Sequence, residues 1–146
     1  MIRVSTVNES NSEVVWRVHD QLAEEQGLRT TTADIEISGG DQVIVLAGRV
    51  RTQILYDLAD RIARRAAGSW SVDNRLISDE ALTIQTATKA GKDPRTADAD
   101  VRFDVFLGVA HVLGKVGSQQ QHDALLELAG SVPGVNRVED HTVIAR

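Results

Sequence analysis

The sequence repeats itself once, at a constant offset of 66 positions and without a gap. Residues 12–77 and 78–143 share thirteen identities. A tandem duplication constrains the fold strongly, because both halves must then adopt the same arrangement of helices and strands. We therefore predict two small domains, at residues 12–77 and 78–146, preceded by a polar lead-in at residues 1–11.

The first copy begins with a predicted amphipathic helix. Ser12 is a suitable first residue, and Val15, Val18 and Leu22 recur at the spacing of one helical face. Gly27 is a suitable stop. The helix therefore has one apolar face to bury against a sheet.

Two strands follow this helix. Ile35 and Ile37 alternate with acidic residues, which is typical of a half-buried strand, and residues 43–50 form a second apolar stretch. The segment between them, at positions 38–42, reads S-G-G-D-Q. We expect its glycines to supply the positive φ angles that a hairpin turn needs.

The clearest helical pattern in the chain comes next. Thr52 can cap a helix over residues 53–66, Gly68 can end it, and residues 70–77 form a third strand. Strand–helix–strand crossovers are right-handed in about 98% of cases, so the second and third strands should be parallel. The predicted fold class is α+β, with two tandem α-β-β-α-β units, each a small three-stranded mixed sheet with two helices on one face.

The second copy has the same elements with a weaker first helix, and we expect its second helix at residues 119–131. Its predicted hairpin carries Phe103, Phe106 and Leu107. A domain of about 60 residues buries only about 60% of its unfolded surface, so we expect the copies to pack on each other or on a partner. Any homodimer should use the second copy.

Composition excludes several classes of protein. The net charge of −5 argues against nucleic-acid binding, which depends on neutralising phosphate with Lys and Arg. The chain has no cysteine, which excludes disulfides and thiolate catalysis. No apolar span is long enough for a transmembrane segment, and no signal peptide is evident. As written the sequence predicts a cytoplasmic protein, and a periplasmic one if a leader has been removed.

Short motifs at equivalent places in both copies resemble the BON domain, a family named for bacterial osmotically induced and nodulation-related proteins. At the end of the second strand the first copy reads V-L-A-G-R-V and the second reads L-G-K-V. After the following helix, each copy has a glycine and further spaced residues. These are Gly68, Val72 and Asn74 in the first copy and Gly134, Val135, Val138 and Asp140 in the second. The resemblance implies a non-enzymatic module that associates with phospholipid or other envelope components, with a role in stress response. The alternative is a soluble interaction or sensing domain that acts by self-association or by binding a small ligand or cation.

Candidate ligand-binding residues lie near these motifs. Glycines at the end of the second strand allow close approach of a ligand to the backbone, nearby cations suit anionic head groups, and tryptophans suit a membrane interface. The candidates are Gly48, Arg49, Arg51, Gly114, Lys115, Trp16 and Trp70. The alternatives are a structural turn for the glycines, a solvated face for the cations, including Arg61, Arg64 and Arg65, and core packing for the tryptophans.

Catalytic and cofactor sites are not expected. The sequence contains no phosphate-binding glycine loop and no arrangement of paired carboxylates. Four histidines, His19, His111, His122 and His141, have no partner at metal-ligand spacing along the chain. We therefore predict no catalytic residue, no metal site, no cofactor and no enzymatic activity.

Overall fold

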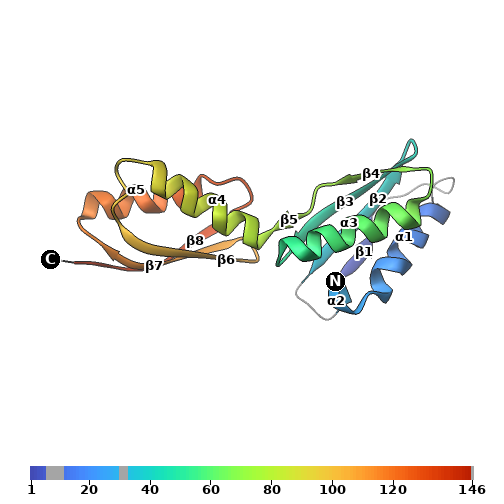
Figure 1. Ribbon diagram of the computed structural model, residues 1–146, viewed down its shortest axis with the longest axis horizontal. Coiled ribbons are helices and arrows are strands. Elements are labelled where there is room, and N and C mark those ends of the chain that lie inside the picture. The colour runs from blue at the N-terminus through green and yellow to red at the C-terminus, as the bar shows by residue number, and fades with distance from the viewer. Residues whose placement is uncertain (6–11, 30–32, 146) are drawn as a thin grey trace. The chain divides into compact units, whose positions relative to one another are not determined.

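A computed structural model describes residues 1–5, 12–29 and 33–145. The chain folds as two compact units, Met1–Ser78 and Asp79–Arg146, each with its helices on one face of its sheet (Figure 1). The predicted α+β fold class is confirmed. No helix within the described residues is long and apolar enough to cross a membrane.

The first unit has a mixed sheet of five strands among its described residues, where three were predicted. In chain order its elements are β1 (Ile2–Val4), α1 (Ser12–Glu24), α2 (Gln26–Arg29), β2 (Asp34–Gly40), β3 (Val43–Val50), α3 (Gln53–Ala67), β4 (Ser71–Asn74) and β5 (Ile77–Ser78). β2 pairs antiparallel with β3, and both β4 and β5 pair parallel with β3. The predicted parallel pairing is therefore confirmed.

Part of the predicted lead-in is a strand. β1 pairs parallel with β2, and Ile2 and Val4 pack against the core of the unit. Arg3 forms ion pairs with Asp34 and with Glu36, the latter at 3.1 Å between Nη2 and Oε2. Residues 6–11 of the lead-in lie outside the described residues.

The predicted third strand is interrupted. β4 and β5 both lie along β3, but at Arg75 the chain leaves the ladder after its amide donates to the carbonyl of Leu46 at 2.8 Å. The amide of Leu76 then donates to Oδ1 of Asn74 at 3.0 Å. This side-chain hydrogen bond replaces a sheet hydrogen bond, so the strand divides in two.

The first hairpin turns at a different place from the one expected. Gly39 and Gly40 belong to β2 and pair with Ile44 and Val43 of β3. The two turn residues are Asp41 and Gln42, with φ angles of 53° and 61°. Positive φ at both positions is the pattern of a type I′ turn, so the expectation that the glycines supply it is wrong.

The second unit repeats the first without a β1 counterpart among its described residues. Its elements are α4 (Asp79–Lys92), β6 (Asp100–Phe106), β7 (Val109–Val116), α5 (Gln119–Gly130) and β8 (Arg137–Ile144). β6 pairs antiparallel with β7, and β7 pairs parallel with β8. β6 and β7 begin and end 66 positions after β2 and β3, as the duplication predicts.

The two units bury helices of different character. α1 buries Val15, Val18 and Leu22, all fully inaccessible to solvent. α4 buries Leu82, Thr86 and Ala90, and the Thr86 hydroxyl donates to the carbonyl of Leu82 at 2.7 Å. The buried face of α4 is therefore smaller and partly polar, as the sequence predicts for the first helix of the second copy.

Candidate functional site

The exposed face of α4 carries two lysines that separate two hollows of the second unit. Lys89 and Lys92 line both hollows, and we call this pair the lysine ridge. The larger hollow, of about 480 Å³, is completed by Asp93, Pro94, Arg95, Glu127, Leu128 and Ser131. The smaller, of about 320 Å³, is completed by Ile84, Gln85, Thr88, Val132 and Pro133.

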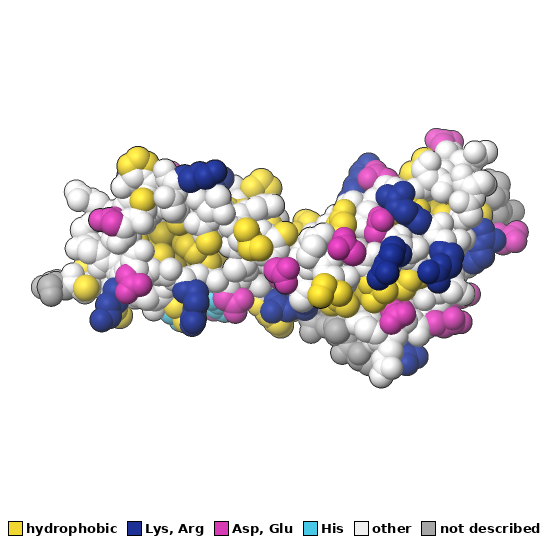
Figure 2. All heavy atoms as spheres, in the orientation of Figure 1, with side chains coloured by type: hydrophobic (Ala, Val, Ile, Leu, Met, Phe, Trp, Pro, Cys, Tyr) yellow, Lys and Arg dark blue, Asp and Glu magenta, His cyan; other side chains and the backbone are white. Residues whose placement is uncertain are grey.

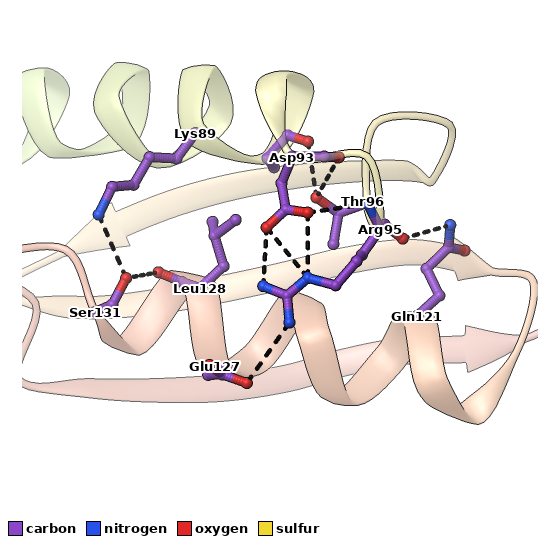
Figure 3. Close-up of polar contacts among 9 residues, drawn as sticks. Lys89, Asp93, Arg95, Thr96, Gln121, Glu127, Leu128 and Ser131 are labelled. Carbon is purple, nitrogen blue, oxygen red and sulfur yellow. Dashed lines mark hydrogen bonds and ion pairs between the residues drawn. The ribbon is translucent and has the colours of Figure 1, made fainter.

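No carboxylate neutralises the lysine ridge. Nζ of Lys89 donates to Oγ of Ser131 at 3.4 Å, and the Ser131 hydroxyl donates to the carbonyl of Leu128 at 2.7 Å (Figure 3). Lys92 has no ion-pair partner in the part of the chain that the structure describes. Both ammonium groups are therefore available to an anion from solution.

Arg95, close to the ridge, is neutralised. Its Nη2 lies 2.8 Å from Oδ2 of Asp93, and its Nη1 lies 3.9 Å from Oε2 of Glu127 (Figure 3). The hydrogen bonds from Arg95 lower the pKa of the Asp93 carboxyl, which therefore stays ionised. The buried Thr96 hydroxyl donates to the carbonyl of Ala90 at 2.7 Å, so this loop is held against the end of α4.

An apolar surface lies beside the lysines. Ile84 is 60% exposed, although it lies on a helix with a buried face. Together with Val132 and Pro133 it lines the smaller hollow. Figure 2 shows hydrophobic side chains and a cationic group next to one another over α4 of this unit. The surface is amphipathic, with an apolar part and a cationic border.

The structure explains the two predicted glycines by backbone geometry. Gly48 has a φ of +119° and Gly114 a φ of +124°. A Cβ atom on Gly48 would lie 1.9 Å from the carbonyl oxygen of Asp34, and one on Gly114 would lie 2.2 Å from that of Asp100. The paired strand therefore occupies the space that a side chain would need.

The predicted cations lie at the ends of two different strands. Arg49 is half-buried at the end of β3, and Arg51 is half-buried just beyond it. Lys115 is exposed on β7, where it pairs with Asp100 and Val143. Arg49 and Arg51 thus lie near Gly48 in the first unit, and Lys115 lies next to Gly114 in the second.

The two tryptophans differ in exposure. Trp70 is partly buried and packs against the core near the beginning of β3, whereas Gly48 is near its end. Trp16 is 48% exposed on α1, and its ring meets that of His19 edge-on with centroids 5.0 Å apart. Core packing is confirmed for Trp70, and Trp16 belongs to a surface that does not include Trp70.

The arginines near the end of α3 lie among acidic groups. Nε of Arg64 lies 2.8 Å from Oδ2 of Asp60, and this hydrogen bond lowers the pKa of Asp60. Arg65 lines a hollow of about 440 Å³ that also contains Glu24 and Glu25. Figure 2 shows cationic and anionic side chains intermixed over α3. This face therefore has the mixed charge of a solvated helix.

Sequence reasoning missed the lysine ridge. A usable signal was present, because Ile84, Thr88 and Lys92 recur every four residues and lie on one face of a helix. What could not be predicted is that Arg95 would be neutralised while both lysines stayed without a carboxylate. That distinction depends on loop contacts that only the folded chain makes.

Comparison with known sequences covers both units. The family model of the BON domain matches residues 11–77 and again residues 78–146. The osmotically-inducible protein Y of Escherichia coli (strain K12) is 25% identical over 143 residues, which cover 89% of this chain and 70% of that protein. The repeated unit recognised in the sequence is thus a known domain.

Comparison with solved structures identifies the same fold. CdsD, a structural protein of the type III secretion system of Chlamydia trachomatis, superposes with a TM-score of 0.68 at 15% identity. The match covers 92% of this chain and 63% of that one, which is less than two thirds of its length. A structure of the CdsD C-terminal domain gives a TM-score of 0.64 at 14% identity, covering 92% and 67%. These identities establish likeness of fold alone.

Proposed function

Because the chain belongs to the BON domain family, with two of its domains in tandem, we propose that it is a non-enzymatic module that binds anionic phospholipid of the cell envelope through α4. The observation that carries the proposal is the lysine ridge beside exposed Ile84. Two ammonium groups without carboxylate partners beside an exposed apolar side chain are features that a helix at an anionic membrane surface uses.

The electrostatic part of the binding comes from Lys89 and Lys92. Each Lys or Arg near an anionic membrane surface contributes about 1 kcal/mol, and the contribution falls off within a Debye length. The two lysines together therefore supply about 2 kcal/mol, which corresponds to about a 30-fold change in the binding constant. Raising the ionic strength reduces this contribution.

The apolar part comes from Ile84 and its neighbours. Burial of a large aliphatic side chain contributes about 1.5–3 kcal/mol when it is fully removed from water. Ile84 is 60% exposed and gains part of this on entering the region between head groups and acyl chains. Peripheral attachment by one helical face needs no membrane-spanning segment.

The name of the E. coli relative supports a place in the envelope. That protein is called osmotically inducible, and the envelope is the structure on which osmotic change acts. We propose that this chain acts there as well, under osmotic stress, by holding to the lipid surface.

Co-sedimentation with vesicles tests the proposal. The full chain is mixed with vesicles of phosphatidylcholine alone and of phosphatidylcholine with phosphatidylglycerol, and the bound fraction is measured at low and high salt. The native chain should bind the anionic vesicles, and a double variant with Lys89→Gln and Lys92→Gln should bind them about 30-fold more weakly. Ile84→Ser should weaken binding to a smaller extent that is insensitive to salt.

A matched control changes the same charge in the other unit. Arg61→Gln with Arg65→Gln also removes two exposed cations, but from the mixed-charge face of α3. Binding of this variant should equal that of the native chain. Equal losses in the two double variants would mean that net charge alone drives binding, and no binding of the native chain to anionic vesicles would refute the proposal.

A further inference from the structure

Three potential metal ligands meet on the helix-free face of the second sheet. His111 lies on β7, and Glu139 and His141 lie on β8. The parallel register places His111 directly beside Glu139, and His141 follows two residues later on the same face of β8. His111 is 28 positions from Glu139 and 30 from His141, which is why spacing along the chain did not reveal the cluster.

The three ligand atoms are arranged as the corners of a small triangle. Nδ1 of His111 lies 3.4 Å from Oε2 of Glu139 and 3.4 Å from Nε2 of His141, and the last two atoms are 3.7 Å apart. The point in their plane that is equidistant from the three atoms lies about 2.0 Å from each. An ion slightly to one side of this plane would therefore lie within the range of zinc–nitrogen and zinc–oxygen bonds, about 2.0–2.2 Å. One ion could therefore contact all three atoms with little movement of the side chains.

The carboxylate of Glu139 is held in the orientation that the site needs. Its Oε1 accepts a hydrogen bond from Nη2 of Arg137 at 2.8 Å, while its Oε2 faces the two imidazoles. The two rings are nearly parallel, with an interplanar angle of 13° and centroids 5.6 Å apart. Support of a ligating carboxylate by a further hydrogen bond is a common property of metal sites.

The cluster is accessible from solution. The side chains of His111, Glu139 and His141 are 30%, 39% and 50% exposed. Both histidines line a hollow of about 690 Å³, so there is room for water or an additional ligand in the open coordination positions. The charged residues near the cluster are of both signs, namely Arg102 and Asp104 on β6, Lys115 on β7 and Arg137 on β8.

The first unit has different residues at the equivalent positions. Positions 66 earlier hold Val45, Asp73 and Arg75. There Nε of Arg75 lies 2.8 Å from Oδ2 of Asp73, so an ion pair occupies the place of the cluster. The cluster is therefore a property of the second copy and does not follow from the shared fold.

We propose that His111, Glu139 and His141 form a binding site for a divalent transition-metal ion, with Zn²⁺ as its representative. Two imidazoles and one carboxylate suit Zn²⁺, Cu²⁺ and Ni²⁺, whereas Ca²⁺ and Mg²⁺ prefer sites made entirely of oxygen ligands. With three protein ligands, the fourth position of a tetrahedral Zn²⁺ ion is open to the hollow.

Calorimetric titration of the full chain, free of any histidine tag, with zinc chloride tests this site. The native chain should bind one Zn²⁺ ion per chain. Loss of a residue that only hydrogen-bonds a metal ligand weakens metal binding about 10–100-fold. His111→Ala removes a ligand itself and should weaken zinc binding by more than this. His141→Arg, which installs the side chain found at the same place in the first unit, should do the same. Calcium and magnesium chlorides should neither bind at this site nor compete.

His19→Gln is the matched control, because it removes a histidine of the first unit. Its zinc affinity and stoichiometry should equal those of the native chain. In native protein, Zn²⁺ should also shift the imidazole NMR signals of His111 and His141 and leave those of His19 and His122 in place, a result that does not depend on the folding of a variant. Absence of saturable binding, or binding unchanged by His111→Ala and His141→Arg, would overturn the proposal.

Discussion

Gly48 and Gly114, 66 positions apart, have nearly the same backbone conformation, with φ angles of +119° and +124°. In both places an added Cβ atom would collide with a carbonyl oxygen of the neighbouring strand. The distance from Cβ to that oxygen would be 1.9 Å in the first unit and 2.2 Å in the second. Both copies thus have a close approach of two paired strands that only glycine permits.

Substitution of either glycine should destabilise its unit. Gly48→Ala and Gly114→Ala each force a side chain into a conformation that costs about 1–3 kcal/mol, before the overlap with the opposite carbonyl is counted. Urea unfolding measures the loss. Gly40→Ala is the control, because no atom lies within 4 Å of its added Cβ and its φ is not positive. Unchanged unfolding of both glycine variants would show that the strands can separate there without cost.

The turn between β2 and β3 can be improved. Asp41 and Gln42 adopt positive φ angles, which glycine and asparagine tolerate best. The double change Asp41→Asn with Gln42→Gly should raise the free energy of unfolding by about 0.5–1 kcal/mol, since it relieves the unfavourable conformation at position 42. Thermal unfolding checks this. Gln42→Ala leaves an unfavourable φ at position 42 and should not raise the free energy of unfolding. An equal increase from Gln42→Ala and from the double change would contradict the turn geometry.

The contact between His122 and Asp140 predicts a pH dependence of stability. Nε2 of His122 lies 2.6 Å from Oδ2 of Asp140. Hydrogen bonds from Thr142 and then His122 lower the pKa of Asp140 from 3.8 to about 2, and Asp140, followed by Asp123, raises the pKa of His122 above 6.5. The contribution of His122 to stability is fully present below pH 6.5 and is lost as pH rises through its raised pKa. The contribution of Asp140 is fully present above pH 3.8 and is lost as pH falls towards 2.

A double-mutant cycle with His122→Gln and Asp140→Asn measures this contribution. Because both side chains are partly exposed, the coupling should be about 1 kcal/mol or less at pH 5. It should be smaller at pH 8.5, where the imidazole is losing its proton. A coupling that grows between pH 5 and pH 8.5 would show that the contact does not depend on a charged imidazole.

Self-association should involve the hairpin between β6 and β7. Phe106 and Leu107 are 42% and 40% exposed at its tip. Because Leu107 has a φ of 50°, Leu107→Asn can be made without distorting the backbone. Sedimentation velocity of the full chain should show a dimer at high concentration that the double variant Phe106→Ser with Leu107→Asn abolishes. A dimer that persists in this variant would place the interface elsewhere.

Features that depend on neighbouring residues could be predicted from the sequence. Thr52 and Ser118 occupy equivalent places 66 apart, and each accepts a hydrogen bond from the third residue after it. The strand at Val43–Val50 and its repeat follow from apolar runs bounded by turn residues. Local chemistry determines these elements in both copies.

Features that depend on strand register could not be predicted. β1 has three residues, too few to show a pattern, and it forms because β2 offers a free edge. His111 and His141 become neighbours only when β8 pairs with β7 in one register, since a shift by one residue would move His141 to the other face. The site on the second sheet is therefore determined by tertiary structure.

The side chains of β6 affect how the protein can associate at high concentration. It is an edge strand among the described residues, and its exposed positions carry Asp100, Arg102 and Asp104 in alternation with buried Phe103 and Val105. An open edge is a template for intermolecular β-sheet, and charged side chains along it oppose such growth. One edge of the first sheet is β1, whose three residues offer few backbone groups to another strand. These two edges thus oppose intermolecular pairing by different means, charged side chains along β6 and short length at β1.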